Sequence, residues 1–355
     1  MKFLINSLVF LTTLAVFVIA GAAYWAYDQF QKPGPLENTI TVNIPHGSSV
    51  YGISEILVDK GVISRQAFTP VNIFVYGSKI TEQSGRLKAG EYEFPPHLSI
   101  AQILDKLEEG KVIQRQITIR EGLTNWEIEQ FLMNEGVLDK EEEVLPLPEG
   151  SYLPETYSYQ NGDSVAGFMQ RMNQSMENVI LPLCGILLER EASASFAVFL
   201  PQDCPNAKAP LKTVGDVLTL ASIIEKETAV PSERRRVAGV FFNRLRMNMA
   251  LQTDPTVIYA ITKGEHQNDG KGPLGRRLLK KDLEFDSPYN TYLYPGLPPG
   301  AICNPGKASI EAALNPEEHK YIYFVADGSG GHAFATTLAG HNANVAKWRQ
   351  IRKGK

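Results

Sequence analysis

The sequence is poor in the residues and motifs that most often mark a metal, nucleotide or nucleophile site. Its 355 residues include six histidines and three cysteines, and neither set has the spacing of metal ligands. No Gly-x-Ser-x-Gly, His-Glu-x-x-His, Walker A or dinucleotide-binding motif occurs. A formal net charge of −4 gives no electrostatic basis for binding nucleic acid. We therefore expect no metal, no cofactor and no nucleic-acid partner.

Charge is also absent from Phe3 to Tyr27, near the amino terminus. About 20 apolar residues span a bilayer, so residues 1–27 are predicted to be a single transmembrane anchor. The aromatic residues at its far end, Tyr24 to Tyr27, would lie at the membrane interface. Lys2 precedes the run, which favours a cytoplasmic amino terminus in the inner membrane and an exported remainder. The alternative is a cleaved signal peptide, since Ala20-Gly-Ala22 resembles a cleavage site.

The three cysteines leave two interpretations open. In an exported protein Cys184 and Cys204 could close a disulfide loop and leave Cys303 free. Alternatively, all three are incidental.

The pattern of apolar residues predicts an α+β protein with an N-terminal transmembrane helix. A Pro/Gly linker at 28–38 precedes a β-α-α-β unit at 39–111, with strands near 40–44 and 87–94 and helices near 49–60 and 64–78. Residues 112–355 are predicted to form a second α+β domain. Within it, residues 178–212 have no clean period. A hairpin at 321–334 and a terminal helix at 341–352 end the chain.

A single carboxylate, Glu225, interrupts the apolar stripe of a helix predicted at 214–228. At about 100° per residue, Glu225 falls inside the stripe formed by Val214, Val217, Leu218, Ala221 and Ile224, and Glu227 falls on the opposite side. A carboxyl group held against apolar surface has a raised pKa, which suits a general acid near neutral pH. The competing interpretation is a buried glutamate paired with an arginine of segment 234–244.

The loops after this helix are rich in Tyr, Asn, Gln, Thr and Pro, a combination that suits a carbohydrate. Rings stack on the C–H faces of a sugar, and amides and hydroxyls match its hydroxyl groups. Most glycosidases need two carboxylates, and Asp254 is the obvious second candidate. It precedes Pro255, however, and an Asp-Pro step favours a turn.

Six motifs in this order resemble the MltG (YceG-like) endolytic murein transglycosylases. They are Ala221-Ser-Ile-Ile-Glu-Lys-Glu-Thr228, Phe242-Asn-Arg-Leu245, Leu251-Gln-Thr-Asp-Pro-Thr-Val-Ile-Tyr259, Tyr289-Asn-Thr-Tyr292, Gly296-Leu-Pro-Pro-Gly-Ala-Ile302 and Tyr323-Phe-Val-Ala-Asp-Gly328. The resemblance extends to the transmembrane segment and to the unit at 39–111, which looks like the LysM-like subdomain of the family. It weakens over residues 178–212.

The resemblance implies a membrane-anchored lytic transglycosylase that cleaves the β-1,4 bond between N-acetylmuramic acid and N-acetylglucosamine in nascent glycan strands. Glu225 matches the family's catalytic glutamate; it would act first as acid and then as base, giving 1,6-anhydromuramyl ends. Peptidoglycan synthases are expected partners. The residues expected to bind substrate are Gln252, Thr253, Asp254, Asn290, Tyr292 and Glu227.

Two other functions compete with this one. The first is a wall-binding scaffold without catalysis, and the second is a hydrolase that pairs Glu225 with Asp254 or Glu155. Anhydro ends, reducing ends or no product would distinguish the three.

Overall fold

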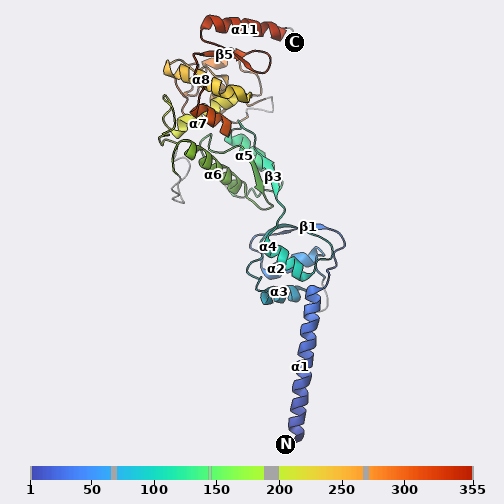
Figure 1. Ribbon diagram of the computed structural model, residues 1–355. Helices are drawn as coiled ribbons and strands as arrows, with labels where there is room; N and C mark the ends of the chain where they lie inside the picture. Colours follow the sequence, from blue (N-terminus) through green and yellow to red (C-terminus); the bar gives the residue numbers. More distant parts are fainter. Residues whose placement is uncertain are drawn as a thin grey trace. The chain divides into compact units, whose positions relative to one another are not determined.

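The computed structural model describes residues 2–64, 70–142, 144, 146–187, 200–266 and 272–353. These residues form a mixed helix and strand structure with two compact units (Figure 1). The first unit comprises Met1–Arg115 with Ser158–Asp163, and the second comprises Gln116–Tyr157 with Ser164–Lys355. The α+β prediction is confirmed.

The chain begins with α1 (Lys2–Gln31), whose apolar side chains are exposed. The window Ile5–Gln31 has a mean hydropathy of 2.1 and none of it is buried, so the helix is long and apolar enough to cross a membrane. The helix continues four residues beyond Tyr27, into the segment predicted as a linker. Its last turn contacts the first unit, where Phe30 packs against the apolar core.

The rest of the first unit has the predicted β-α-α-β order. Its elements are β1 (Ile40–Ile44), α2 (Val50–Asp59), α3 (Pro70–Ile80), β2 (Gly90–Phe94) and α4 (Ile100–Glu109). The strands pair antiparallel, with Ile40 opposite Phe94 and Ile44 opposite Gly90. Alternate residues of both strands face a core shared with the helices, because successive side chains of a strand point to opposite faces. The predicted second helix began at 64, and residues 65–69 lie outside the described residues.

The next elements are β3 (Arg115–Thr118), α5 (Asn125–Met133), β4 (Thr156–Tyr159) and α6 (Val165–Leu183), and most of their residues belong to the second unit. β3 and β4 form a two-stranded sheet. Thr124 caps α5 with a capping box that it shares with Glu127. The α6 helix extends into the region that showed no clean period, because Ile180 and Leu181 continue the apolar face of the buried methionines past residue 178.

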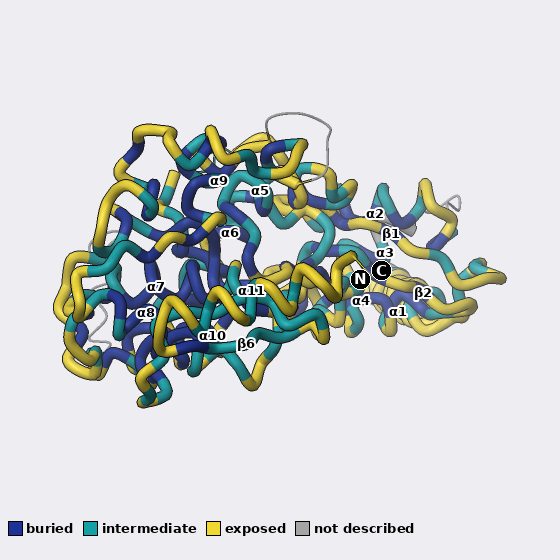
Figure 2. Tube along the Cα trace, turned by 90° about the horizontal axis from the view of Figure 1, so that it is seen from above, coloured by how far each residue is buried: buried dark blue, intermediate teal, exposed yellow. Residues whose placement is uncertain are grey.

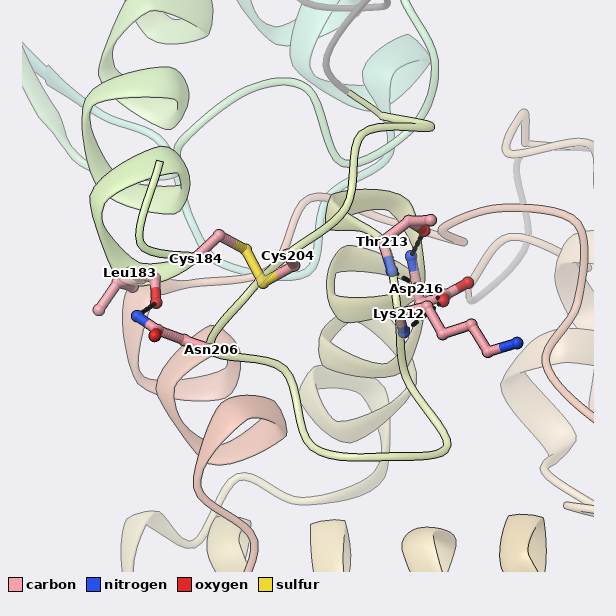
Figure 3. The surroundings of a disulfide bond; sticks show 7 residues. All are labelled: Leu183, Cys184, Cys204, Asn206, Lys212, Thr213 and Asp216. Carbon is pink, nitrogen blue, oxygen red and sulfur yellow. Dashed lines mark hydrogen bonds between the residues drawn. A yellow bond between two sulfur atoms is a disulfide. The ribbon is translucent and has the colours of Figure 1, made fainter. Parts of the chain in front are cut away.

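A disulfide joins Cys184, at the end of α6, to Cys204 (Figure 3). The bond closes a chain segment whose residues 188–199 lie outside the described part. The Asn206 side chain supports the junction by donating a hydrogen bond of 2.9 Å to the Leu183 carbonyl. Of the two interpretations of the cysteines, the structure has the paired one, and Cys303 is free and buried.

Helices dominate the remainder of the second unit. They are α7 (Val214–Glu227), α8 (Arg234–Arg246), α9 (Asp254–Thr262), α10 (Lys307–Leu314) and α11 (Leu338–Lys353), with 3-10 turns η2 (Pro231–Glu233) and η3 (Lys280–Glu284). The predicted hairpin is confirmed as β5 (Tyr323–Ala326) paired antiparallel with β6 (His332–Ala335). The α7, α8 and α10 helices pack together around one apolar core, and Figure 2 colours most of α7 as buried.

Candidate active site

The α7 helix begins at a strong sequence signal. Thr213 accepts a hydrogen bond from the Asp216 N–H, and the Asp216 carboxylate accepts hydrogen bonds from Lys212 and Thr213 N–H groups (Figure 3). These contacts satisfy N–H groups that a helix start leaves without partners. The cap fixes the rotational phase of α7, and with it the directions in which the two glutamates near its end project.

The predicted apolar stripe is too narrow, because α7 is buried on every side. Leu220 and Ile223 are both 0% exposed, and at about 100° per residue they fall on either side of the angle of Glu227. The face that carries Glu227 is therefore as apolar as the face that carries Glu225. Leu220 and Ile223 already indicated in the sequence that this second face is apolar. The helical wheel alone therefore does not distinguish the two glutamates.

Glu225 lies in a network of charges and backbone groups. Its side chain is 7% exposed, and one oxygen lies 3.5 Å from Arg234 Nη2. The other oxygen accepts a hydrogen bond of 3.0 Å from the Gly306 N–H. Arg234 also contacts Glu121 at 3.3 Å, and burial together with the negative charge of Glu225 raises the pKa of Glu121. These contacts match the ion-pair interpretation of Glu225.

Glu227 is half-buried and has different neighbours. Burial raises the pKa of Glu227 to about 7, and the negative charge of Asp254 adds to this shift, while Arg244 opposes it. A carboxyl group with a pKa near neutrality exchanges a proton readily at physiological pH, which general acid–base catalysis requires. Burial and the charge of Asp254 therefore give Glu227 the property that an acid–base group needs.

Arg244, which the sequence offered only as a possible ion-pair partner of Glu225, is a component of the site near Glu227. It is 7% exposed, and its guanidinium donates to the carbonyls of Ile322 at 2.7 Å and Leu251 at 2.6 Å. The same group lies 5.5 Å from the centre of the Tyr323 ring. Arg244 therefore fixes the segment that leads into α9 and also supplies the positive charge near Glu227. Its position among the apolar, inward-facing residues of α8 was the sequence feature that could have identified Arg244.

Asp254 and Tyr292 come together as expected of a polar site. The Tyr292 hydroxyl donates a hydrogen bond of 2.6 Å to Asp254 Oδ1, and the negative charge of Glu227 contributes to the raised pKa of Tyr292 after burial and Asp254. Gln252 is exposed and has a φ of 50°, with its N–H bonded to the Thr291 carbonyl at 3.0 Å. The left-handed backbone at Gln252 turns the chain immediately before α9.

The side chains of Asn290 and Thr253 are buried and form hydrogen bonds within the protein. Asn290 is 0% exposed, and its amide donates to the carbonyls of Leu283 at 2.9 Å and Phe285 at 2.8 Å. Thr253 is 2% exposed and bonds to Thr256 and Thr291. Both residues hold the loops together because their polar atoms are already paired. Binding of substrate by Asn290 and Thr253 stays a prediction, and both side chains are already paired within the protein.

Glu149 is a second carboxyl that the sequence did not indicate. Burial raises the pKa of Glu149 to about 8, and its two oxygens accept hydrogen bonds from the Asn125 N–H at 3.2 and 3.1 Å. Among the residues that the structure describes, no group of three or more His, Cys, Asp and Glu side chains could hold a metal ion.

The α+β fold and the buried carboxyl groups of Glu227 and Glu149, whose pKa values are raised, are features of an enzyme that uses a carboxyl group as an acid or base. The signature of the YceG-like family matches residues 42–347, and the chain belongs to this family.

Named relatives and one solved structure are similar over most of the chain. A Bacillus subtilis (strain 168) protein named endolytic murein transglycosylase is 32% identical, over 93% of this chain and 91% of that protein. A Streptococcus pneumoniae serotype 2 protein of the same name is 28% identical, over 97% of this chain but 65% of that protein. A crystal structure of a yceG-like protein from Listeria monocytogenes is 33% identical, with a TM-score of 0.48, over 86% of this chain and 99% of that one.

Proposed function

We propose that this protein is a membrane-anchored endolytic murein transglycosylase that cleaves peptidoglycan glycan strands. Family membership and the names of the relatives support the general activity. The bond expected to break is the β-1,4 bond between N-acetylmuramic acid and N-acetylglucosamine. The product would be a 1,6-anhydromuramyl end, and cleavage of nascent strands would terminate their elongation.

One carboxyl group is sufficient for this reaction. In its neutral form the carboxyl donates a proton to the glycosidic oxygen while an oxocarbenium-like centre develops. As carboxylate it then accepts the proton of the muramyl 6-hydroxyl, which closes onto C1. The proton balance returns the group to its neutral form, so the free enzyme must be protonated to begin.

Two glutamates are candidates for this carboxyl. Glu225 is supported by its place in the apolar stripe and by the match to the family motif. Glu227 is supported by its buried, charged surroundings. The observation that favours Glu227 is its pKa of about 7 beside Asp254 and Tyr292. Glu225 instead lies in an ion pair with Arg234 and accepts a hydrogen bond from the Gly306 N–H. We therefore propose Glu227 as the acid and base, with Glu225 as the alternative.

The experiment is a matched pair of amide substitutions in the full chain, Glu225→Gln and Glu227→Gln, assayed by mass spectrometry of digested peptidoglycan. The amide has a similar volume and cannot act as an acid, so loss of acid catalysis lowers the rate by about 10² or more. We expect Glu227→Gln to lose anhydromuropeptide release. Loss in Glu225→Gln alone, with the fold intact, would return the role to Glu225.

The same mass spectra test the competing functions. Reducing ends in place of anhydro ends would support a hydrolase that uses Asp254 or Glu155 as a second carboxylate. No product from the wild-type protein, together with binding to peptidoglycan, would support a scaffold.

We further propose that α1 anchors the protein in the cytoplasmic membrane, with a cytoplasmic amino terminus and the residues that follow α1 outside. The length and hydropathy of α1 support the anchor, and the Cys184–Cys204 disulfide supports an oxidising compartment. The β-α-α-β unit would bind peptidoglycan in the manner of LysM-like subdomains. Synthases of nascent strands are the expected protein partners.

A further inference from the structure

A cavity in the second unit lies apart from both candidate catalytic glutamates. Its volume is about 770 Å³, and neither Glu225 nor Glu227 lines it. Small-ligand pockets commonly have volumes of about 300–1,000 Å³. The wall includes Leu218, which precedes Glu227 by nine positions on α7 and thus by about 13 Å along the helix axis. Several linked sugar rings would span that distance.

Aromatic side chains form a large part of the cavity wall. Trp126, Tyr152, Tyr259 and Tyr289 line it, with Pro298 and Pro299 beside them. The ring centres of Tyr259 and Tyr289 are 4.9 Å apart. Trp126, Tyr259 and Tyr289 are half-buried, so part of each ring is open to solvent. Rings with a polar edge pack well against ligands that have both apolar faces and hydroxyl groups.

A rigid polar centre completes the wall. Glu149 lines the cavity and accepts hydrogen bonds from the Asn125 N–H through both oxygens. The Asn125 amide in turn donates to the Leu147 carbonyl at 2.8 Å, and Asn304 donates to Asn125 Oδ1 at 2.8 Å. This network holds the carboxyl in place before any ligand binds, and preorganised groups lose less entropy on binding.

The protonation state of Glu149 decides which hydrogen bonds it can form with a ligand. Its pKa of about 8 keeps the carboxyl mostly neutral at pH 7, so it offers a hydroxyl donor as well as acceptor oxygens. Lys263 adds a second donor at the wall, with Nζ 5.7 Å from the centre of the Tyr289 ring. A ligand with acetamido and hydroxyl groups would match these donors and the rings together.

We propose that this cavity binds an N-acetylated amino sugar of the glycan strand, at a distance from the bond that is cleaved. The inference rests on the proposed function for the identity of the strand, and it deepens that function by adding a remote sugar subsite. A remote subsite would hold the strand on one side of the cut, which favours cleavage within a strand over cleavage at its end.

The test measures sugar binding without cleavage, using the full chain in detergent and tri-N-acetylchitotriose as the probe. The protein has three tryptophans, so Trp25→Phe with Trp348→Phe leaves Trp126 as the only fluorescent indole. We expect a saturable change in Trp126 emission. Calorimetry should then show that Trp126→Ala weakens binding by about tenfold, whereas Trp348→Ala, on α11 outside the cavity, stays within about twofold of the wild type.

A second variant guards against misfolding of Trp126→Ala. Lys263→Gln removes a charged donor from the surface of the wall and should weaken binding while leaving the thermal unfolding temperature unchanged. Absence of chitotriose binding at millimolar concentration, unaltered affinity in both cavity variants, or binding of a free stem peptide in place of the sugar would each overturn the proposal.

The outcome is separable from that of the proposed function. Anhydromuropeptide release without sugar binding at the cavity would refute only the subsite. Sugar binding at the cavity without any cleavage product would leave the subsite standing and refute the transglycosylase activity.

Discussion

Glu225 accepts a hydrogen bond of 3.0 Å from the Gly306 N–H, which joins the last turn of α7 to the residue that precedes α10. The carboxylate is thereby held between a backbone donor and Arg234. Glu227, two residues along the same helix, faces Asp254 and Arg244 instead. Two glutamates of one short motif therefore have separate physical roles available to them.

Glu225→Ala should lower the free energy of unfolding by about 1–3 kcal/mol, because the Gly306 N–H and Arg234 would remain buried without this partner. Chemical denaturation of the full chain in detergent checks this. The control is Glu311→Ala, whose exposed ion pair with Lys307 at 3.9 Å should contribute about 0–1 kcal/mol. Equal effects of the two substitutions would contradict the structural role of Glu225.

The pH dependence of activity should follow Glu227. If its neutral form starts the reaction, kcat/KM is highest at low pH and falls as pH rises through about 7. Asp254→Asn removes a negative charge that raises this pKa, so the fall should move to lower pH. The control is Asp286→Asn, because Asp286 accepts an equivalent 2.6 Å hydrogen bond from Tyr294 in the same loop. If the pH at which kcat/KM falls shifted equally in both variants, the assignment of this titration to Glu227 would be excluded.

The Cys184–Cys204 disulfide should stabilise the second unit. Removing a native disulfide costs about 2–5 kcal/mol in small secreted domains, and this bond closes a sequence separation of 20 residues. Cys184→Ser with Cys204→Ser should therefore lower the unfolding temperature. Cys303→Ser is the control for loss of a thiol. Peptide mapping without reductant should recover the 184–204 link, and a link that involves Cys303 would be inconsistent with its burial as a free thiol.

A chain that begins at residue 28 should be soluble, folded and active on isolated glycan. The exposed apolar part of α1 is removed, while Phe30 remains and packs on the core of the first unit near Gly77. A chain that begins at residue 36 loses Phe30 and should unfold at lower temperature. Thermal unfolding compares the two. If the 28–355 chain were also unfolded, the membrane-spanning part of α1 would be needed for folding.

Much of the architecture follows from local patterns in the sequence. The run without charge predicted α1, alternation of apolar residues predicted β1, and the hairpin signal at 321–334 predicted β5 and β6. Helical periodicity predicted α7. The pattern of α6 was harder to recognise because Pro182 and Cys184 end it within an apolar segment.

Other features depended on residues that are far apart in the sequence. The pKa of Glu227 is shifted by burial and by the charges of Asp254 and Arg244, which come from later elements. The disulfide was one of two open interpretations until Cys184 and Cys204 were placed together. Glu149 could be recognised as a cavity residue only after α5, α7 and α9 were assembled around it.

By itself, therefore, the sequence determined most of the helices, the C-terminal hairpin, the apolar N-terminal helix and the two glutamates of α7, because periodicity and turn signals act over a few residues. Tertiary structure alone decided which carboxyl is desolvated, which is paired with a cation and which polar side chains remain open to a ligand. These properties follow from the distance to charges and apolar surface contributed by other elements, and helical periodicity within α7 carries no information about those distances.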